Sequence, residues 1–174
     1  MELIGAVAPA KDSRIVDIGG GASRLVDCLL EDGYEHLTVV DVSEAALQAA
    51  RERLGVRAES VTWRAADVRN LRLPEEVDVW HDRAVFHFLT SEGDRARYKD
   101  RLSSVLKPGG SAIIATFALE GPEKCSGLPV ARYSAESLAS ELGDQFALVD
   151  ARRHLHTTPW GATQAFQYSR FTRT

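Results

Sequence analysis

The sequence predicts a single α/β domain, residues 1–174, built on a doubly wound, mostly parallel seven-stranded sheet with helices on both faces. Strand and helix patterns alternate along the chain with short breaks between them, which is the arrangement that makes β–α–β units. The first strand pattern ends in a glycine turn. The last two strand patterns are joined by a short turn, which favours an antiparallel hairpin. A length of 174 residues suits one domain with a substantial core.

The first half of the chain predicts three strands. The apolar opening segment 1–10 is expected to be the tail of a helix, and the strands are expected at 14–18, 36–41 and 60–65. A helix beginning near Ser23 ends at Gly33. Ser43 is a suitable N-cap for the next helix, which ends at Gly55.

The second half predicts the rest of the sheet. A strand at 77–81 is followed by a helix that opens with a capping-box pattern at Ser91 and stops at Lys107-Pro108-Gly109-Gly110. Further strands are predicted at 111–117, 147–157 and 163–172, with a helix at 134–142. The connection after residue 117 is long enough to suggest a function.

Composition limits the partners and the location. The net charge of −4 argues against a broad basic surface for nucleic acid. The cysteines, Cys28 and Cys125, lack metal-site spacing and suit a reducing compartment. The apolar opening segment is too short for a membrane span and has no basic region typical of a signal peptide. We therefore expect a cytoplasmic protein without a membrane partner, and the oligomeric state stays open.

The segment Ile15-Val16-Asp17-Ile18-Gly19-Gly20-Gly21-Ala22-Ser23 is the strongest functional signal. Glycines after an apolar strand let a ligand lie against bare peptide groups where a helix begins. The dinucleotide fingerprint is only half met, because Arg24 stands at the third glycine position. An acid two residues before the first glycine instead points into the ligand crevice, where it can take a cationic amine.

Acidic residues end three successive strands, at Asp17, Asp41 and Asp67. Ligands of open α/β sheets bind at the carboxyl ends of the strands, so these side chains are expected to line one crevice. Asp41 can accept both hydroxyls of a ribose. Asp67 can accept an adenine amino group while the Val68 amide serves a ring nitrogen, although Asp67 can equally be a helix or turn cap.

Together with Lys107 to Gly110, these motifs resemble the class I S-adenosylmethionine (SAM) dependent methyltransferases. The resemblance runs from about residue 14 to 171 and implies strand order 3-2-1-4-5-7-6 with strand seven antiparallel. It implies SAM as cofactor, with S-adenosylhomocysteine as product and no metal. The implied cofactor residues are Asp17, Gly19, Gly20 and Gly21 at the methionine part, Asp41 at the ribose and Asp67 at the adenine. Ser23, Val42 and Val68 are further candidate cofactor-binding residues, and Asp82 is expected to anchor the cofactor or the substrate.

The chain departs from the family pattern in two places. Ser23 replaces a glycine at the third small position, which is a modest change. Family members usually carry further N-terminal helices that cover the cofactor, whereas about thirteen residues precede the first strand here. The resemblance therefore predicts a lid that is absent, shortened or supplied by a partner, with an effect on affinity and turnover.

The segment after the fourth strand, residues 81–89, is where the family places the transferred methyl. His87 and His81 are the candidate general bases, and each can alternatively be a packed histidine. Arg83 can pair with Asp82 or hold an anionic substrate. Neither an Asn/Asp-Pro-Pro-Tyr motif nor a nearby cysteine is present, so methylation of base amino groups and of cytosine rings is disfavoured.

Candidate acceptor-binding residues come from the loop after the fifth strand and from the final hairpin. They are Arg83, Cys125, Arg132, Tyr133 and Trp160, and ordinary packing is the alternative for Trp160. His154 and His156 share a strand face without an evident third ligand, so a solvent-facing pair is preferred to a metal site.

The sequence thus predicts an enzyme that methylates a small molecule. A protein lysine methyltransferase is the first alternative, because the family includes such enzymes. A SAM- or nucleotide-binding protein without catalysis is the second, and an NAD-linked oxidoreductase is the third. The identity of the acceptor stays open.

Overall fold

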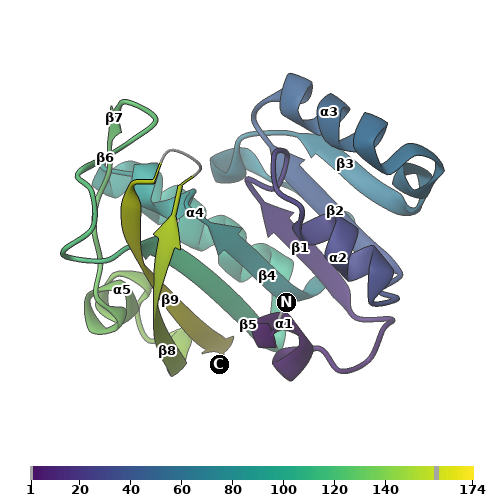
Figure 1. The fold of residues 1–174 in the computed structure, drawn as a ribbon. Helices are drawn as coiled ribbons and strands as arrows, with labels where there is room; N and C mark the ends of the chain where they lie inside the picture. Colours follow the sequence, from purple (N-terminus) through teal and green to yellow (C-terminus); the bar gives the residue numbers. More distant parts are fainter. Residues whose placement is uncertain (1, 159–160) are drawn as a thin grey trace.

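The computed structural model describes residues 2–158 and 161–174, and these form one mixed seven-stranded sheet in the order β3-β2-β1-β4-β5-β9-β8 (Figure 1). The first five strands are parallel, whereas β9 is antiparallel to both β5 and β8. The predicted fold class and strand order are confirmed, with β8 and β9 as the sixth and seventh strands of the sheet. Their bounds are β1 Arg14–Ile18, β2 His36–Asp41, β3 Val61–Ala65, β4 Val77–Arg83, β5 Leu106–Phe117, β8 Phe146–Thr157 and β9 Thr163–Arg173.

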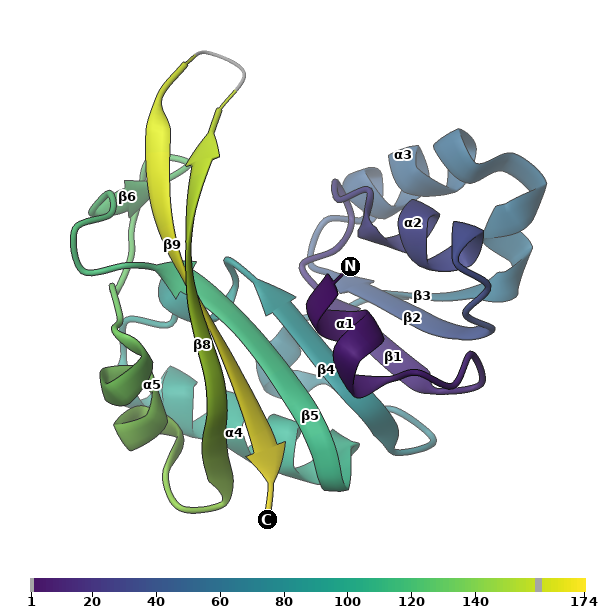
Figure 2. The same cartoon turned by 60° about the horizontal axis from the view of Figure 1, so that its bottom comes forward.

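Helices cover both faces of this sheet (Figure 2). Apolar residues of α1, α2 and α3 pack on one face in a cluster that includes Ile15 and Val79, and residues of α4 and α5 pack on the other face in a cluster that includes Val16 and Trp80. Successive strand residues point to opposite faces, which explains why neighbours in one strand belong to different clusters. The helices are α1 Glu2–Val7, α2 Leu25–Glu31, α3 Glu44–Leu54, α4 Glu92–Val105 and α5 Ala135–Leu142, with short 3₁₀ turns η1 Gly55–Ser60, η2 Val68–Asn70 and η3 Phe86–Phe88.

Serine caps begin three of these helices. The hydroxyl of Ser43 accepts from the amide of Ala46, and that of Ser91 accepts from the amide of Asp94. Ser134 and Ser137 form a reciprocal capping box at α5. Each cap satisfies an amide that the helix itself leaves unpaired.

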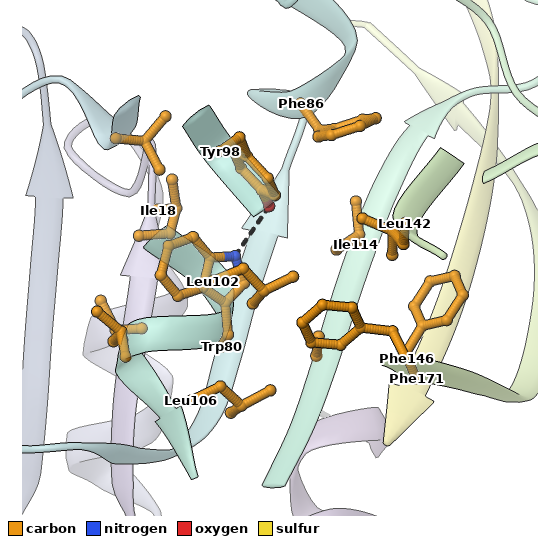
Figure 3. Close-up of a cluster of buried hydrophobic side chains, with 14 of the residues drawn as sticks. Ile18, Trp80, Phe86, Tyr98, Leu102, Leu106, Ile114, Leu142, Phe146 and Phe171 are labelled. Atoms are coloured by element: carbon orange, nitrogen blue, oxygen red, sulfur yellow. Dashed lines mark hydrogen bonds between the residues drawn. The ribbon is translucent and has the colours of Figure 1, made fainter. Parts of the chain in front are cut away.

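The core under β4 and β5 is built around aromatic side chains (Figure 3). Trp80 and Tyr98 are fully buried and meet edge to face, with ring centroids 5.6 Å apart. The indole Nε1 of Trp80 donates to the Tyr98 hydroxyl over 2.9 Å. This bond satisfies a polar group that burial would otherwise penalise.

Some predicted boundaries need correction. Residues 107–110 do not separate the helix from the next strand, because β5 begins directly after α4 at Leu106. The strand β4 continues through Asp82 to Arg83, two residues beyond the prediction. The loop after β5 contains a two-residue hairpin, β6 Lys124–Cys125 and β7 Leu128–Pro129.

The strand β8 forms an edge of the sheet and is exposed along most of its length. Its pairing with β9 is interrupted by an irregularity between Leu148 and Asp150. None of the helices in the described ranges is both long enough and apolar enough to cross a membrane.

Candidate active site

The glycine turn after β1 is held tightly between neighbouring segments. Gly19 has a φ of +72°, which L side chains rarely adopt, and its amide donates to the carbonyl of Val40 over 2.7 Å. A Cβ at Gly20 would lie 2.3 Å from Oδ2 of Asp17, and a Cβ at Gly21 would lie 2.9 Å from the Cβ of Ala46. Side chains are thus excluded from this turn by the geometry around it. Ser23 accepts from the amide of Leu25 over 3.0 Å.

Asp17 lies beneath this turn and is 3% exposed. Its Oδ1 lies 2.7 Å from Nδ1 of His81, which occupies the matching register position on β4. Its Oδ2 is buried and has no hydrogen-bond partner within the described residues. A buried carboxylate oxygen without a donor is costly, so this atom marks a place for a cationic or donor group of a ligand.

Asp41 ends β2 and binds backbone amides with both of its oxygens. Oδ2 accepts from Gly21 over 3.1 Å, and Oδ1 accepts from Ser43 over 2.9 Å. The first bond joins the end of β2 to the glycine turn. The next residue, Val42, is 75% exposed although it is apolar, which leaves its side chain available to a ligand at this edge.

Asp67 caps the turn η2, as the alternative interpretation of the sequence anticipated. Its carboxylate accepts from the amide of Arg69 over 2.9 Å and also pairs with the Arg69 guanidinium, which in turn binds Asp94. The hydrogen bonds from Arg69 lower the pKa of Asp67. Val68 is buried. An adenine amino group at Asp67 would share this carboxylate with Arg69.

Asp82 points to the opposite face of β4 from His81 and is fully buried. Its carboxylate accepts from the Tyr98 hydroxyl over 2.7 Å and from the amides of Val85 and Phe86 over 2.9 and 3.1 Å. Burial raises the pKa of Asp82 to about 6, although these donors favour the charged form. The predicted role as a cofactor anchor therefore has no exposed atom to serve it, and the contacts show a residue that positions the segment after β4.

That segment has an unusual backbone. Ala84 has a φ of +69°, and its amide donates to the carbonyl of Ala115 over 2.8 Å. This conformation costs free energy in a non-glycine residue, and the surrounding contacts must offset that cost. Sequence reasoning did not identify Ala84, because no residue pattern signals such a conformation.

His87 lies in η3 and is 0% exposed. Its ring packs against Phe117 with centroids 4.7 Å apart, and burial lowers its pKa to about 4. The imidazole is therefore neutral at neutral pH and in this conformation does not reach the surface. His81, which is 9% exposed, is the better placed of the two predicted bases.

Of the predicted acceptor residues, Arg83 ends β4, whereas Cys125, Arg132 and Tyr133 lie in the connection between β5 and α5. Tyr133 is 8% exposed and its ring packs against Phe86 at 5.5 Å, whereas Arg132 binds the carbonyl of Gly121 and Glu123. Cys125 is a half-buried free thiol on β6. Trp160 lies outside the described residues.

A cavity of about 300 Å³ lies on the sheet face beside His81. It is bordered by α1 and by the β8–β9 hairpin, and its lining includes Arg152, His154 and Tyr168. The sequence predicts His154 only as one of a solvent-facing pair with His156. In the structure His154 meets Tyr168 edge to face at 6.2 Å, and within the described residues no cluster of three metal-ligating side chains forms. Strand alternation predicts that Arg152 and His154 lie on one face of β8, but it does not predict that this face lies beside His81.

Comparisons with known proteins agree with this geometry. The methyltransferase domain family matches residues 15–110, which is more than half of the chain. A search of curated proteins gave no match.

Solved structures share the fold over almost the whole chain. The 1,6-didemethyltoxoflavin-N1-methyltransferase of Burkholderia thailandensis, solved with 1,6-didemethyltoxoflavin and S-adenosylhomocysteine, has a TM-score of 0.78 and 22% identity over 99% of this chain and 76% of that chain. The N-methyltransferase NodS of Bradyrhizobium japonicum WM9 in complex with S-adenosylhomocysteine has a TM-score of 0.76 and 19% identity, over 98% and 83%. A SAM-dependent methyltransferase of Methanosarcina mazei has a TM-score of 0.79 and 15% identity, over 99% and 97%.

The family match covers the glycine turn, the three acidic strand ends and the segment after β4. The strand order and the antiparallel β9 agree with the same assignment. The chain belongs to the methyltransferase domain family and is a class I SAM-dependent methyltransferase.

Proposed function

We propose that this chain transfers a methyl group from SAM to a small-molecule acceptor and releases S-adenosylhomocysteine. The observation that carries the cofactor assignment is the buried Oδ2 of Asp17, which lies under the glycine turn without a protein donor. SAM has an ammonium group in its methionine part, and this positive charge above the glycine turn would stabilise the buried carboxylate beneath it.

The remaining binding residues follow the edge of the sheet. Gly19, Gly20 and Gly21 give the methionine part close access to the backbone, with Ser23 at the end of the turn. Asp41 is the ribose residue, and Val42 offers an exposed apolar side chain to the adenine. Asp67 and Val68 complete the adenine site. The Asp67 carboxylate, whose pKa is lowered by Arg69, accepts from the adenine amino group, and the Val68 amide donates to a ring nitrogen. SAM, when bound, supplies an electrophilic methyl group on a sulfonium.

The protein has two tasks in this reaction: aligning the acceptor and, where the acceptor holds a proton, removing it. We assign the second task to His81. When Oδ1 of Asp17 accepts from Nδ1, the imidazole keeps its lone pair on Nε2 and is held in one orientation. His81 lines the cavity beside α1, so an acceptor in that cavity can deliver its proton to Nε2.

A small acceptor is favoured by the size of this cavity, since about 300 Å³ is at the lower end of the range for small-molecule sites. The Burkholderia thailandensis neighbour, which was solved with 1,6-didemethyltoxoflavin bound, supports the same class.

The first test is calorimetric titration of the purified chain with S-adenosylhomocysteine, with NADH titrated in parallel. We expect one-to-one micromolar binding of S-adenosylhomocysteine and none of NADH. Tighter binding of NADH would favour an oxidoreductase, and no binding of either would contradict the cofactor assignment.

The second test compares His81→Gln with His36→Gln, which changes an exposed histidine at the other end of the sheet. We expect His81→Gln to keep S-adenosylhomocysteine binding and lose 10²- to 10⁴-fold in turnover, roughly the range for a lost general base. His36→Gln should retain both. Equal turnover in the two variants would remove His81 from the mechanism.

A further inference from the structure

Arg83 is an exposed cation at the end of β4, next to the proposed methyl-transfer site. Its guanidinium lies over the ring of Phe166, 5.0 Å from the ring centroid. Stacking on a ring leaves the edge of the guanidinium, which carries the N–H donors, free to bind a ligand. Within the described residues, no carboxylate forms an ion pair with Arg83, unlike the arginines on β8.

Those neighbouring arginines are already neutralised. Arg152 pairs with Glu2 over 2.6 Å and with Asp150 over 3.2 Å. Arg153 pairs with Glu120 from the loop after β5. Arg152 shares a face of the sheet with Tyr168, its register partner on β9. An anion entering this face would have to displace a carboxylate to reach Arg152, whereas it can bind Arg83 without such competition.

Arg83 and His81 are two residues apart on β4, so both side chains leave the same face of the sheet. That spacing corresponds to roughly 7 Å along a strand, which a small molecule can bridge. Phe166 and Tyr168 lie on the same face of β9, with ring centroids 6.3 Å apart. Phe166 is 3% exposed beneath the guanidinium of Arg83, so the half-buried Tyr168 is the ring that a ligand beside Arg83 can contact.

We infer that the acceptor is a small molecule with a carboxylate and an apolar or aromatic portion. The carboxylate binds the guanidinium of Arg83, the apolar portion packs against Tyr168, and the nucleophilic atom faces His81. A carboxylate is preferred to a dianionic phosphate because one planar guanidinium matches the two oxygens of a carboxylate. This inference rests on the proposed function, since it names the acceptor class for the same site.

The test uses matched pairs of probes with the S-adenosylhomocysteine-saturated protein: benzoate with benzamide, 4-aminobenzoate with 4-aminobenzamide, and 3-mercaptopropionate with 3-mercaptopropionamide. Binding is measured by ligand-observed NMR and calorimetry on four proteins: the wild type, Arg83→Gln, Arg83→Lys and Arg57→Gln. Arg57 is exposed on η1 and pairs with Glu31, so its substitution controls for the loss of one positive charge.

We expect at least one acid to bind the wild type tenfold or more tightly than its amide. Arg83→Gln should abolish that preference without changing S-adenosylhomocysteine affinity, Arg83→Lys should retain part of it, and Arg57→Gln should retain all of it. The inference is overturned if no acid binds more tightly than its amide, or if the preference survives in Arg83→Gln. Failure of S-adenosylhomocysteine to bind would instead contradict the proposed function, and the acid preference can then still be measured on the unliganded protein.

Discussion

Gly19 and Val85 lie so close together that a Cβ on Gly19 would sit 2.3 Å from Cγ2 of Val85. The contact joins the glycine turn to the segment after β4, and therefore the proposed cofactor site to the proposed acceptor site. Val85 is itself held by the bond from its amide to Asp82. The buried carboxylate of Asp82 thus holds Val85 in place, and the side chain of Val85 packs against the glycine turn.

Gly19→Ala should therefore damage both binding and stability. The substitution adds a clash with Val85 to a backbone conformation that alanine rarely adopts. We expect the loss of measurable S-adenosylhomocysteine binding and a decrease of about 1 to 3 kcal/mol in the free energy of unfolding, measured by calorimetry and urea denaturation. Gly93→Ala is the control, because Gly93 lies in α4 with open space around it. Normal binding by Gly19→Ala would show that the turn can move away.

Asp41→Ala tests the ribose assignment. Removal of this carboxylate should weaken S-adenosylhomocysteine by about 1.5 to 3 kcal/mol, the range for a hydrogen bond to a charged group. Part of the loss will come from the amides of Gly21 and Ser43, which lose their acceptor. Asp100→Ala, an exposed position on α4, should leave the affinity unchanged. Unaltered affinity in Asp41→Ala would exclude a contact between this residue and the ribose.

Tyr98→Phe should raise the pKa of Asp82 above its value of about 6. The Tyr98 hydroxyl donates to the carboxylate and so favours its charged form, while burial opposes it. The pKa is measured from the pH dependence of the Asp82 carboxyl carbon shift in NMR. Tyr34→Phe is a matched control, because Tyr34 is buried and donates to the carbonyl of Ala8, away from Asp82. An unchanged or lower pKa in Tyr98→Phe would contradict the network.

His87 should make the fold less stable in acid. Its pKa is lowered to about 4 in the folded chain, below the ordinary 6.5, so only the unfolded chain gains this proton between these values. Neutral His87 therefore makes its full contribution to the free energy of unfolding above pH 6.5. As the pH falls to 4, the free energy of unfolding decreases by about 3 kcal/mol. Urea denaturation at several pH values should show a shallower acid loss in His87→Gln than in His36→Gln. Identical profiles would argue against the burial of this ring.

Asp82 acts in the opposite direction over a similar pH range. Its pKa is raised from 3.8 to about 6 in the folded chain, so the folded chain binds the extra proton between these values. Stability from this carboxyl is greatest below pH 4 and falls as the pH rises to 6. The wild type should therefore show a flatter profile than either residue would produce alone, and His87→Gln should expose the Asp82 slope.

The sequence predicted the sheet well because its signals are local. Periodic apolar residues, serine caps and glycine stops lie next to the elements that they define, and the predicted caps Ser43 and Ser91 are both present. The start of β5 was misplaced, since Pro108 and Gly109 suggest a break although the chain passes through them within the strand.

Side-chain roles were harder to predict, because they depend on which face a strand residue occupies. His81 and Asp82 are adjacent, yet one meets Asp17 and the other meets Tyr98 from a helix further along the chain. Alternation predicts that they point apart, but their partners follow from the packing of β1 and α4. The cavity beside His81 likewise depends on a hairpin more than sixty residues later in the sequence.

The charged and irregular edge of β8 also protects the protein in solution. An exposed strand edge presents unpaired backbone groups that another chain can extend, which is a route to aggregation. Arg152 and Arg153 on β8, together with the irregular pairing after Leu148, oppose such extension, because an added strand would have to bury charge and match an uneven ladder. Neutral substitutions at these arginines are therefore expected to lower solubility before they affect the fold.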